Sequence, residues 1–436
     1  MEPIKVGLLG FGTVGAGVAK AFQCNSDVLA RRLGSPLQLI RIADLDITTP
    51  RAVAVDPALL TTDAAAVLDD PAISIVIELI GGYEPARTFV LRAIANGKHV
   101  VTANKALLAL HGEEIFAAAE LAGVNVMFEA AVGGGIPIIS AIKENLCANR
   151  FHSVFGILNG TCNYILTRMT EDGEDFAGVL ADAQAKGYAE TDPTFDVEGI
   201  DTAHKLALLC TLCFGTSIDF NSIYREGITR ITALDIEFAR EFGYTFKLLA
   251  IGKRVNGQIE ARVHPTMLPH DHPLAEVDGV FNAVRLVGDF VGPVMLNGYG
   301  AGMEATASAV MGDVMAVARN LRAGIGVRTP AMSCPQAAIE CFAVRPMDEL
   351  FSRYYLRVFV KDQPGVLAQI AGALGRHSIS IESMIQPHRH EADAVPIVLM
   401  THAAVERDVR AAMAEIDQLE ATCAGSLFVR IEEQLE

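Results

Sequence analysis

A glycine-rich turn near the start of the chain does most to restrict its fold. The turn, Gly10-Phe11-Gly12-Thr13-Val14-Gly15, follows the apolar run Ile4–Leu9 and opens a segment, Val14–Phe22, with apolar residues at helical spacing. In such a strand–turn–helix unit the first glycine permits a tight turn, the second lets the backbone approach a pyrophosphate, and the third allows the helix to pack closely on the strand. The helix N-terminus then offers free amides and a partial positive charge to phosphate. The motif alone also occurs in ordinary glycine-rich loops, so the segments around it must show whether it binds a dinucleotide.

Those surroundings alternate strand-like and helix-like segments. Apolar runs typical of buried strands stand at Leu37–Ala43, Ile73–Leu79, His99–Thr102 and Val124–Phe128. Helical spacing of apolar residues occurs at Pro85–Asn96 and Gly112–Leu121. Strands that alternate with helices form a parallel, doubly wound sheet through right-handed crossovers. We therefore predict an α/β, Rossmann-type dinucleotide-binding domain over residues 1–130.

The residue that would select the dinucleotide is less clearly marked. Asp44 ends the second strand, where an acidic side chain binds the ribose 2′-hydroxyl of NAD, but it lies further from Gly10 than the usual distance of about 20 residues. The extra length is accommodated by residues 23–36. Arg41 and Arg51 are alternatives that would meet the 2′-phosphate of NADP. The sequence is therefore compatible with the use of either NAD or NADP.

Composition excludes several classes of protein. The chain has 436 residues and a net charge of −17, which argues against a general affinity for nucleic acid or anionic membranes. It contains no apolar run of about 18 residues that would span a membrane, and no signal-peptide pattern. Cys210 and Cys213 form a C-x-x-C, but they sit in an apolar helical segment without a second pair at zinc spacing, so we expect a buried helix face. A reduced, cytoplasmic compartment fits best.

Two lysines stand in distinctive surroundings. Lys105 lies in Thr102-Ala103-Asn104-Lys105-Ala106, just after an expected strand and therefore near the sheet edge where doubly wound folds bind ligands. Lys205 ends an acidic run that begins at Glu190. Asp201 precedes Lys205 by four residues, so the two share one helix face and can interact, whereas His204 points elsewhere. On position alone, Lys105 is a surface charge and the acidic run a solvated loop.

The end of the chain has its own pattern. Strands are expected at Tyr355–Val360, Ile379–Gln386, Ala394–Thr401 and Ser426–Ile431, and helices at Gly365–Arg376 and Val405–Ile416. The order βαββαβ is ferredoxin-like. The segment Asp362-Gln363-Pro364-Gly365, with Ile379-Ser380-Ile381 further on, resembles an ACT domain, a small amino-acid-binding regulatory module. We predict this domain over residues 351–436, after a mixed catalytic and dimerisation domain over 131–297 and a return to the first domain over about 298–340.

Together, the glycine turn, the Thr-Ala-Asn-Lys-Ala motif and the acidic run resemble the homoserine dehydrogenase family. Its members interconvert L-homoserine and L-aspartate 4-semialdehyde with a nicotinamide cofactor, in threonine, methionine and isoleucine biosynthesis. The resemblance covers nearly the whole chain. It implies that Lys205 donates the proton and that Lys105, between nicotinamide and substrate, gives electrostatic support, although the sequence leaves open which lysine moves the proton.

The resemblance also implies binding residues. The substrate would be held by Glu190, Asp201 and, as a weaker candidate, Asp196. The cofactor, NAD(P), would be lined by Gly10, Phe11, Gly12, Thr13, Val14, Gly15, Asp44, Lys105 and Gly302. The segment Asn159-Gly160-Thr161-Cys162 matches the family as well, and we expect mainly a strand-to-helix turn capped by its threonine. In the second glycine-rich stretch Tyr299 and Ala305 replace the family's usual prolines, which puts cofactor affinity, rather than reaction type, in question.

A cation site and an effector site follow from the same resemblance. A structural sodium ion would be bound by Glu129 and by the backbone carbonyls of Val132, Gly134 and Ile136, since oxygen ligands suit a hard cation. A plain glycine turn is the alternative for this loop. The ACT-like tail implies feedback inhibition by threonine and side-by-side pairing, hence a homodimer or homotetramer. A tail that only dimerises is the alternative there.

Two other functions compete with this hypothesis. One is a ligand-sensing binding protein with a degenerate Rossmann domain, but a sensor need not keep Lys105, Glu190, Asp201 and Lys205. The other is a dehydrogenase for a different amino acid or semialdehyde. A phosphorylating semialdehyde dehydrogenase would need a cysteine nucleophile in a catalytic frame, which we do not find. The pairs His270/His272 and His388/His390 lack a third metal ligand at diagnostic spacing, so we expect surface loops.

Overall fold

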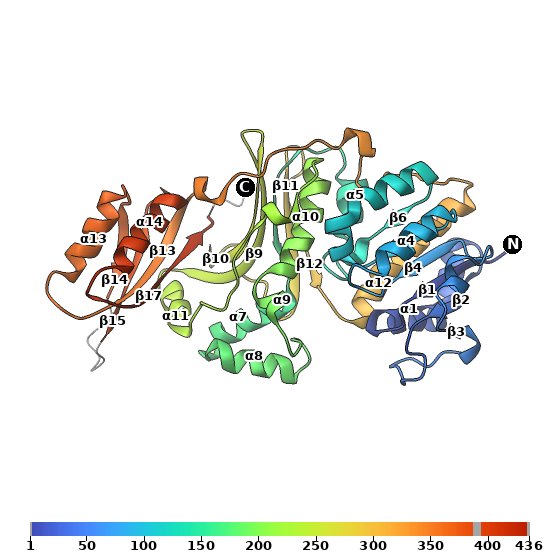
Figure 1. Ribbon diagram of the computed structural model, residues 1–436, viewed down its shortest axis with the longest axis horizontal. Coiled ribbons are helices and arrows are strands. Elements are labelled where there is room, and N and C mark those ends of the chain that lie inside the picture. The colour runs from blue at the N-terminus through green and yellow to red at the C-terminus, as the bar shows by residue number, and fades with distance from the viewer. Residues whose placement is uncertain (1, 387–393, 434–436) are drawn as a thin grey trace.

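The computed structural model describes residues 2–386 and 394–433, and His388 and His390 lie outside these ranges. Three units follow one another along the long axis of the molecule (Figure 1). The N-terminal α/β unit lies at the right of the view, a central sheet with its helices lies in the middle, and a C-terminal unit lies at the left. No helix within the described ranges combines the length and apolar character needed to cross a membrane.

The N-terminal unit is built on a parallel six-stranded sheet. Its strands stand in the spatial order β3 (Leu60–Thr61), β2 (Leu37–Ala43), β1 (Ile4–Leu9), β4 (Ile75–Glu78), β5 (His99–Thr102) and β6 (Val126–Met127). All side chains of β4 and β5 are buried, because helices cover both faces of the sheet. This confirms the predicted doubly wound fold.

Each face of the parallel sheet has its own hydrophobic core. On one face Val6 and Leu8 pack with α1 (Thr13–Cys24) and with Val310 and Val314 of α12 (Met303–Arg322). On the other, apolar side chains of β4 and β5 pack with α4 (Ala86–Ala95) and α5 (Lys105–Ala122). Helix α12, which follows the last strand of the central unit along the chain, thus returns to the N-terminal unit and completes the first core (Figure 1). Gly17 lets α1 approach it, since a Cβ there would lie 2.6 Å from the Met303 carbonyl oxygen.

Two local predictions were wrong. Helix α5 begins at Lys105 rather than at Gly112, because the Asn104 side chain caps it by accepting a hydrogen bond from the Leu107 amide (3.1 Å). The stretch 23–36, expected only as extra length, contains α2 (Ser26–Leu33), which ends at Gly34 in the left-handed conformation. The short helix α3 (Ala65–Leu68) then precedes β4.

The central unit is mainly antiparallel. Its strands are β7 (Phe151–Ile157), β8 (Tyr224–Arg225), β9 (Tyr244–Val255), β10 (Gln258–Pro269), β11 (Phe281–Gly288) and β12 (Gly292–Tyr299). Its helices are α6 (Ile138–Ser140), α7 (Gly160–Asp172), α8 (Phe176–Ala185), α9 (Thr194–Val197), α10 (Ile200–Phe214) and α11 (Ala233–Glu241). A π-helical turn, Ala141–Asn145, continues α6.

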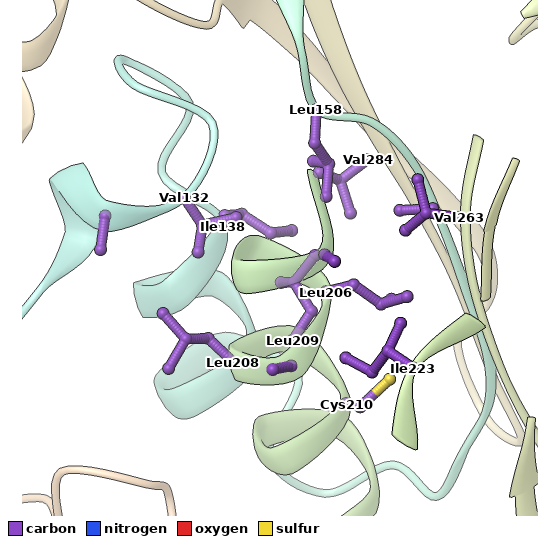
Figure 2. Close-up of a cluster of buried hydrophobic side chains, with 14 of the residues drawn as sticks. Val132, Ile138, Leu158, Leu206, Leu208, Leu209, Cys210, Ile223, Val263 and Val284 are labelled. Atoms are coloured by element: carbon purple, nitrogen blue, oxygen red, sulfur yellow. The ribbon is translucent and has the colours of Figure 1, made fainter. Parts of the chain in front are cut away.

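Helix α10 lies between the central sheet and the N-terminal unit (Figure 1). Figure 2 shows Leu206 and Leu209 of this helix among Leu158, Val263 and Val284. Cys210 and Cys213 are buried in α10 as free thiols, so the C-x-x-C is the helix face that was predicted. A helix that is apolar on almost every side is held in place by packing all around it.

The C-terminal unit has the predicted ferredoxin-like order. It comprises β13 (Phe351–Val360), α13 (Val366–Arg376), β14 (Ile381–Ile385), β15 (Val395–Thr401), α14 (Glu406–Asp417) and β17 (Thr422–Ile431), with β16 (Ala404–Val405) beside β13. The spatial strand order is β17-β13-β15-β14. This sheet is not separate from the central one as expected, because β17 pairs in parallel with β10 at Thr266 and Met267. One sheet of eleven strands therefore runs through both units.

Candidate active site

The two predicted lysines meet at one buried carboxylate. Asp201 stands in the first turn of α10, and Lys205 follows one turn later. The Lys205 Nζ donates to Asp201 Oδ2 (2.7 Å) and to the Leu158 carbonyl (2.6 Å). The Lys105 Nζ, on the first residue of α5, lies 3.2 Å from Asp201 Oδ1. The Asp201 side chain is 6% exposed, that of Lys205 11% and that of Lys105 33%, so the lysines border the open side of the cluster.

The charges of this cluster decide its protonation. Burial by itself would raise the pKa of Asp201, but the ammonium groups of Lys205 and Lys105, with hydrogen bonds from Lys205 and Asn159, hold it below its usual value. Asp201 is therefore an anion at neutral pH. It fixes both ammonium groups within one small volume next to the carboxyl end of β5.

Asn159 links the two inner carboxylates. Its Nδ2 donates to Asp196 Oδ1 (2.7 Å) and to Asp201 Oδ2 (3.0 Å), while its Oδ1 accepts the Cys162 amide and caps α7. The expected threonine cap is thus wrong, and the Thr161 hydroxyl instead donates to the Tyr188 carbonyl (2.7 Å). Burial raises the pKa of Asp196, although the hydrogen bond from Asn159 opposes it. The sequence analysis treated Asn159 only as part of a turn, because its hydrogen bonds to Asp196 and Asp201 join residues that are far apart along the chain.

Glu190 stands apart from this cluster. Its side chain is exposed on the loop between α8 and α9, where its carbonyl accepts a hydrogen bond from Gln184 (3.0 Å). His204, next to Lys205, is buried between two aromatic rings: Phe220 at 4.1 Å and Phe195 at 5.5 Å between centroids. Burial lowers its pKa to about 4, so the imidazole is neutral. The His204 ring is stacked on these two phenylalanine rings, and the sequence did not predict this stacking.

A buried glutamate that sequence reasoning missed supports the Lys105 motif. Glu78 ends β4 with no exposed surface and accepts the Thr102 hydroxyl (2.6 Å) and the Ile80 amide (2.8 Å). Asn104 in turn donates to the Gly82 carbonyl (2.7 Å). Burial raises the pKa of Glu78, while these hydrogen bonds oppose the shift. A carboxylate at the end of an otherwise apolar strand was the signal available in the sequence.

The glycine turn has the shape that a pyrophosphate requires. A Cβ at Gly10 would lie 2.6 Å from the Leu79 carbonyl oxygen, and one at Gly15 would lie 2.2 Å from that of Gly10. A Cβ at Gly12 would meet nothing within 4 Å, so this residue borders open space at the N-terminus of α1. Gly10 and Gly15 are thus needed by the fold, and Gly12 leaves room for a ligand. The residues present therefore fit a dinucleotide.

The other predicted cofactor residues surround this turn. Asp44 accepts the Phe11 amide and lies 3.7 Å from the Arg51 guanidinium, which also contacts Asp46. Arg41 points to the Ala58 carbonyl (3.3 Å). Gly302 precedes α12 with φ of 109°, a conformation that favours glycine, and a Cβ there would meet nothing within 4 Å. Thr13 and Val14 form the start of α1.

The candidate cation loop holds a buried carboxylate. Glu129 accepts the amides of Ile139 (2.7 Å) and Ser140 (2.8 Å), and its own amide donates to Asp313 (2.8 Å). Burial raises the pKa of Glu129. Gly133 and Gly134 have positive φ, which folds the carbonyl-bearing segment 132–136 back on itself. Each Glu129 oxygen keeps lone pairs beyond its amide contact, so this carboxylate could still bind a hard cation.

A glycine turn with the shape expected for a pyrophosphate site and a lysine–carboxylate cluster lie at the carboxyl ends of strands of one parallel sheet, which is the arrangement of a dinucleotide-dependent oxidoreductase. The sequence models of homoserine dehydrogenase, its NAD-binding domain and the ACT domain match residues 137–315, 10–129 and 354–421, respectively. The chain belongs to the homoserine dehydrogenase family, and it interconverts L-homoserine and L-aspartate 4-semialdehyde with NAD(P).

Relatives match over the full length. Homoserine dehydrogenase of Pseudomonas aeruginosa is 46% identical over 99% of this chain and 100% of its own, and that of Neisseria gonorrhoeae is 45% identical over 99% of each. The crystal structure of homoserine dehydrogenase from Thiobacillus denitrificans superposes with a TM-score of 0.93, at 47% identity and 99% coverage of both chains. A hyperthermophilic archaeal homoserine dehydrogenase, solved in complex with NADPH, gives 0.61 at 25% identity over 74% of this chain and 98% of its own. The leading hypothesis is confirmed over the sensor and the other dehydrogenases.

Proposed function

We propose that Lys205 exchanges the proton in the reaction and that Lys105 stabilises charge beside it. A nicotinamide cofactor held at the glycine turn would supply the acceptor for the hydride that leaves the alcohol carbon when homoserine is oxidised. The alcohol proton must then pass to a base, and in the reverse direction an ammonium must donate to the aldehyde oxygen as that oxygen gains negative charge. Two donors of Lys205 are engaged by Asp201 and Leu158, so the third is left for the substrate oxygen. These contacts carry the proposal.

The substrate ammonium is assigned to carboxylates of the same region. Asp201 already receives Lys105, Lys205 and Asn159, so its main role is to position the lysines, with little capacity left for a ligand. Asp196 uses one oxygen for Asn159 and can offer the other to the substrate ammonium. Glu190 would approach from the exposed loop. We infer that Asp196 and Glu190 bind the ammonium group.

The test compares homoserine-dependent reduction of NAD and of NADP in the wild type and in Lys205→Ala. The matched control is Lys186→Ala, which removes an exposed lysine paired with Asp182. We expect turnover to fall by about a hundredfold or more in Lys205→Ala, while cofactor binding persists and the control stays active. Turnover of Lys205→Ala close to that of the wild type would contradict the assigned role.

The dinucleotide is assigned to the groups around the glycine turn. Gly10, Phe11, Gly12, Thr13, Val14 and Gly15 would hold the pyrophosphate, and Gly302 would border the cofactor from α12. Asp44 would accept the 2′-hydroxyl of NAD, and Arg51, beside it, would meet the 2′-phosphate of NADP. We therefore propose that both cofactors are used. Arg51→Ala is expected to weaken NADP binding without weakening NAD binding, measured by fluorescence titration; equal loss for both would contradict it.

We also propose a structural sodium ion bound by Glu129 and the carbonyls of Val132, Gly134 and Ile136. A cation that binds only the folded chain raises its stability with concentration. Melting temperature should therefore rise in sodium chloride relative to choline chloride at equal ionic strength, and the gain should vanish in Glu129→Gln. Glu144→Gln, which alters a nearby residue paired with Arg328, is the control. An equal rise in both salts would exclude the site.

Threonine inhibition and subunit pairing are proposed for the C-terminal unit. Gly365 has φ of 91° and is the N-cap of α13, directly after residues 362–364. We propose that this turn binds threonine and that β14, at the sheet end, pairs two chains into a dimer or tetramer. Inhibition by threonine should be lost in Asp362→Ala and kept in Glu420→Ala, and light scattering should give the subunit number. An uninhibited, monomeric wild type would exclude both.

We propose, finally, the division of labour predicted from the sequence. Residues 1–130, completed by about 298–340, bind the dinucleotide, residues 131–297 bind the substrate, and residues 351–436 regulate the enzyme in the cytoplasm. Cutting before residue 351 and assaying the remaining chain would test it. Loss of threonine response with retained turnover is the expected result, whereas unchanged inhibition would contradict the division.

A further inference from the structure

An open cavity of about 370 Å³ lies between the central sheet and the segment that leads into the C-terminal unit. Its walls come from β8 and the short 3-10 helix before it (η4, Phe220–Ser222), from Glu260 to Arg262 of β10, and from Val344 to Leu350. It belongs neither to the Asp201 cluster nor to the glycine turn. Its volume is within the range of small-molecule sites.

Among the residues that line the cavity, Arg225 is the one that indicates a ligand. This half-buried arginine lines the cavity, and its guanidinium lies 4.5 Å from the centre of the Phe220 ring. Throughout residues 2–386 and 394–433 no carboxylate pairs with it, and it forms no side-chain hydrogen bond there. A guanidinium has five N–H donors, and a partly buried charge without a partner is costly.

The other charged groups of the cavity are already engaged. Arg345 pairs with Glu260 (2.8 Å), and Arg262 pairs with Glu432 (2.8 Å). Arg262 is only 4% exposed, and its Nε has no hydrogen-bond partner among the described residues. Among the described residues, Arg225 is thus the cation of this cavity that has no carboxylate partner. This is a match for a single negative charge, not for a doubly charged phosphate.

The rest of the wall carries apolar side chains as well as the polar residues Asn221, Ser222 and Tyr224. Ile223, Val344, Pro346, Met347 and Leu350 line it. A ligand body that is aliphatic would bury apolar surface here, while a carboxylate would form a two-pronged pair with the guanidinium. We propose that this cavity binds a small aliphatic carboxylate, with Arg225 as its anion partner.

The site is connected to both neighbouring units. Phe220, under the Arg225 guanidinium, stacks on His204, which precedes Lys205 in α10. Ile223 packs in the core that also holds Leu206 and Leu209 of α10 (Figure 2). Tyr224 accepts hydrogen bonds from Arg410 (3.0 Å) and Arg430 (3.2 Å) of the C-terminal unit. A bound carboxylate would therefore order a segment that touches the support of Lys205 as well as the regulatory unit; this consequence rests on the proposed role of Lys205.

The test is calorimetric titration of the full chain. Because it measures binding and not turnover, its result does not depend on whether Lys205 moves the proton. Three probes share one aliphatic body: 4-methylpentanoate has the carboxylate alone, L-leucine has carboxylate and ammonium, and L-leucinamide lacks the carboxylate. We expect 4-methylpentanoate or L-leucine to bind, and L-leucinamide not to bind. Binding of L-leucine without 4-methylpentanoate identifies an amino-acid site, and binding of both identifies a general carboxylate site; each supports the proposal.

The variants test the partner. Arg225→Gln should weaken the binding of the carboxylate by about tenfold to a hundredfold, as expected for loss of a charge-assisted hydrogen bond. Arg225→Lys keeps the positive charge but loses the two parallel N–H donors of the guanidinium, so it should weaken carboxylate binding less than Arg225→Gln does. Arg254→Gln is the matched control, because Arg254 lies over the Phe342 ring (4.6 Å) outside this cavity. Unchanged binding in Arg225→Gln, equal binding of L-leucinamide, or no carboxylate binding at millimolar concentration would overturn the proposal.

Discussion

Asp201 and Lys105 belong to different units of the chain, and yet the Lys105 Nζ lies 3.2 Å from Asp201 Oδ1. The contact joins the start of α10, which lies against the central sheet, to the start of α5, which lies on the parallel sheet. The same carboxylate holds Lys205 through its other oxygen. The relative placement of the two lysines therefore depends on how these two units pack.

The first prediction concerns the charge of Asp201. Asp201→Asn keeps the shape of the side chain but removes the anion between two ammonium groups, which should displace them and lower kcat by about a hundredfold or more. Steady-state kinetics with homoserine checks this. Asp192→Asn, at an exposed position of the same acidic run, should behave as the wild type. A kcat of Asp201→Asn within a few fold of the wild type would show that the lysines do not need this carboxylate.

The second prediction separates the roles of two glycines. Gly12→Ala introduces a Cβ that has no atom of the described residues within 4 Å, so the melting temperature should stay near that of the wild type while dinucleotide affinity falls at least about tenfold. Gly15→Ala places its Cβ 2.2 Å from the Gly10 carbonyl oxygen, so the fold itself should be destabilised. Thermal melting and cofactor titration of both variants give the comparison. Equal behaviour of the two would refute the distinction.

The third prediction is a pH dependence of stability from His204. Burial lowers the pKa of His204 to about 4 from 6.5, so between these values the unfolded chain binds a proton that the folded chain does not. The free energy of unfolding should therefore fall as pH drops through this window, by about 3 kcal/mol for this group. His204→Phe keeps the ring stack and should lose less stability between pH 7 and pH 4.5 than the wild type, measured by urea denaturation. His152→Gln, at an exposed histidine, should follow the wild-type profile.

The fourth prediction tests the core that holds α10. Leu206 is fully buried in the cluster of Figure 2, so Leu206→Ala should lower the free energy of unfolding by about 2–5 kcal/mol. Leu121→Ala removes a leucine that is 92% exposed and should change it by less than about 0.5 kcal/mol. Chemical denaturation measures both. If Leu206→Ala is as stable as Leu121→Ala, the helix is held by something other than this core.

Local patterns predicted a large part of this molecule. The strands Ile4–Leu9, Leu37–Ala43 and His99–Thr102 have the predicted limits, because their apolar runs are bounded by turn residues. The pairing of Asp201 with Lys205 followed from their spacing on one helix. Glu78 and Asn159 were missed in their site roles, since each acts through partners that are distant in sequence.

The sequence by itself determined what short-range physics controls: the strand–turn–helix unit around Gly10, Gly12 and Gly15, the helical face shared by Asp201 and Lys205, and the βαββαβ order of the last unit. Only the tertiary structure decided that Lys105 reaches Asp201, that β17 extends the central sheet beside β10, and that Arg225 lines a cavity. These contacts join segments far apart along the chain. Their geometry is set by the packing of whole helices and sheets, which no local pattern of residues encodes.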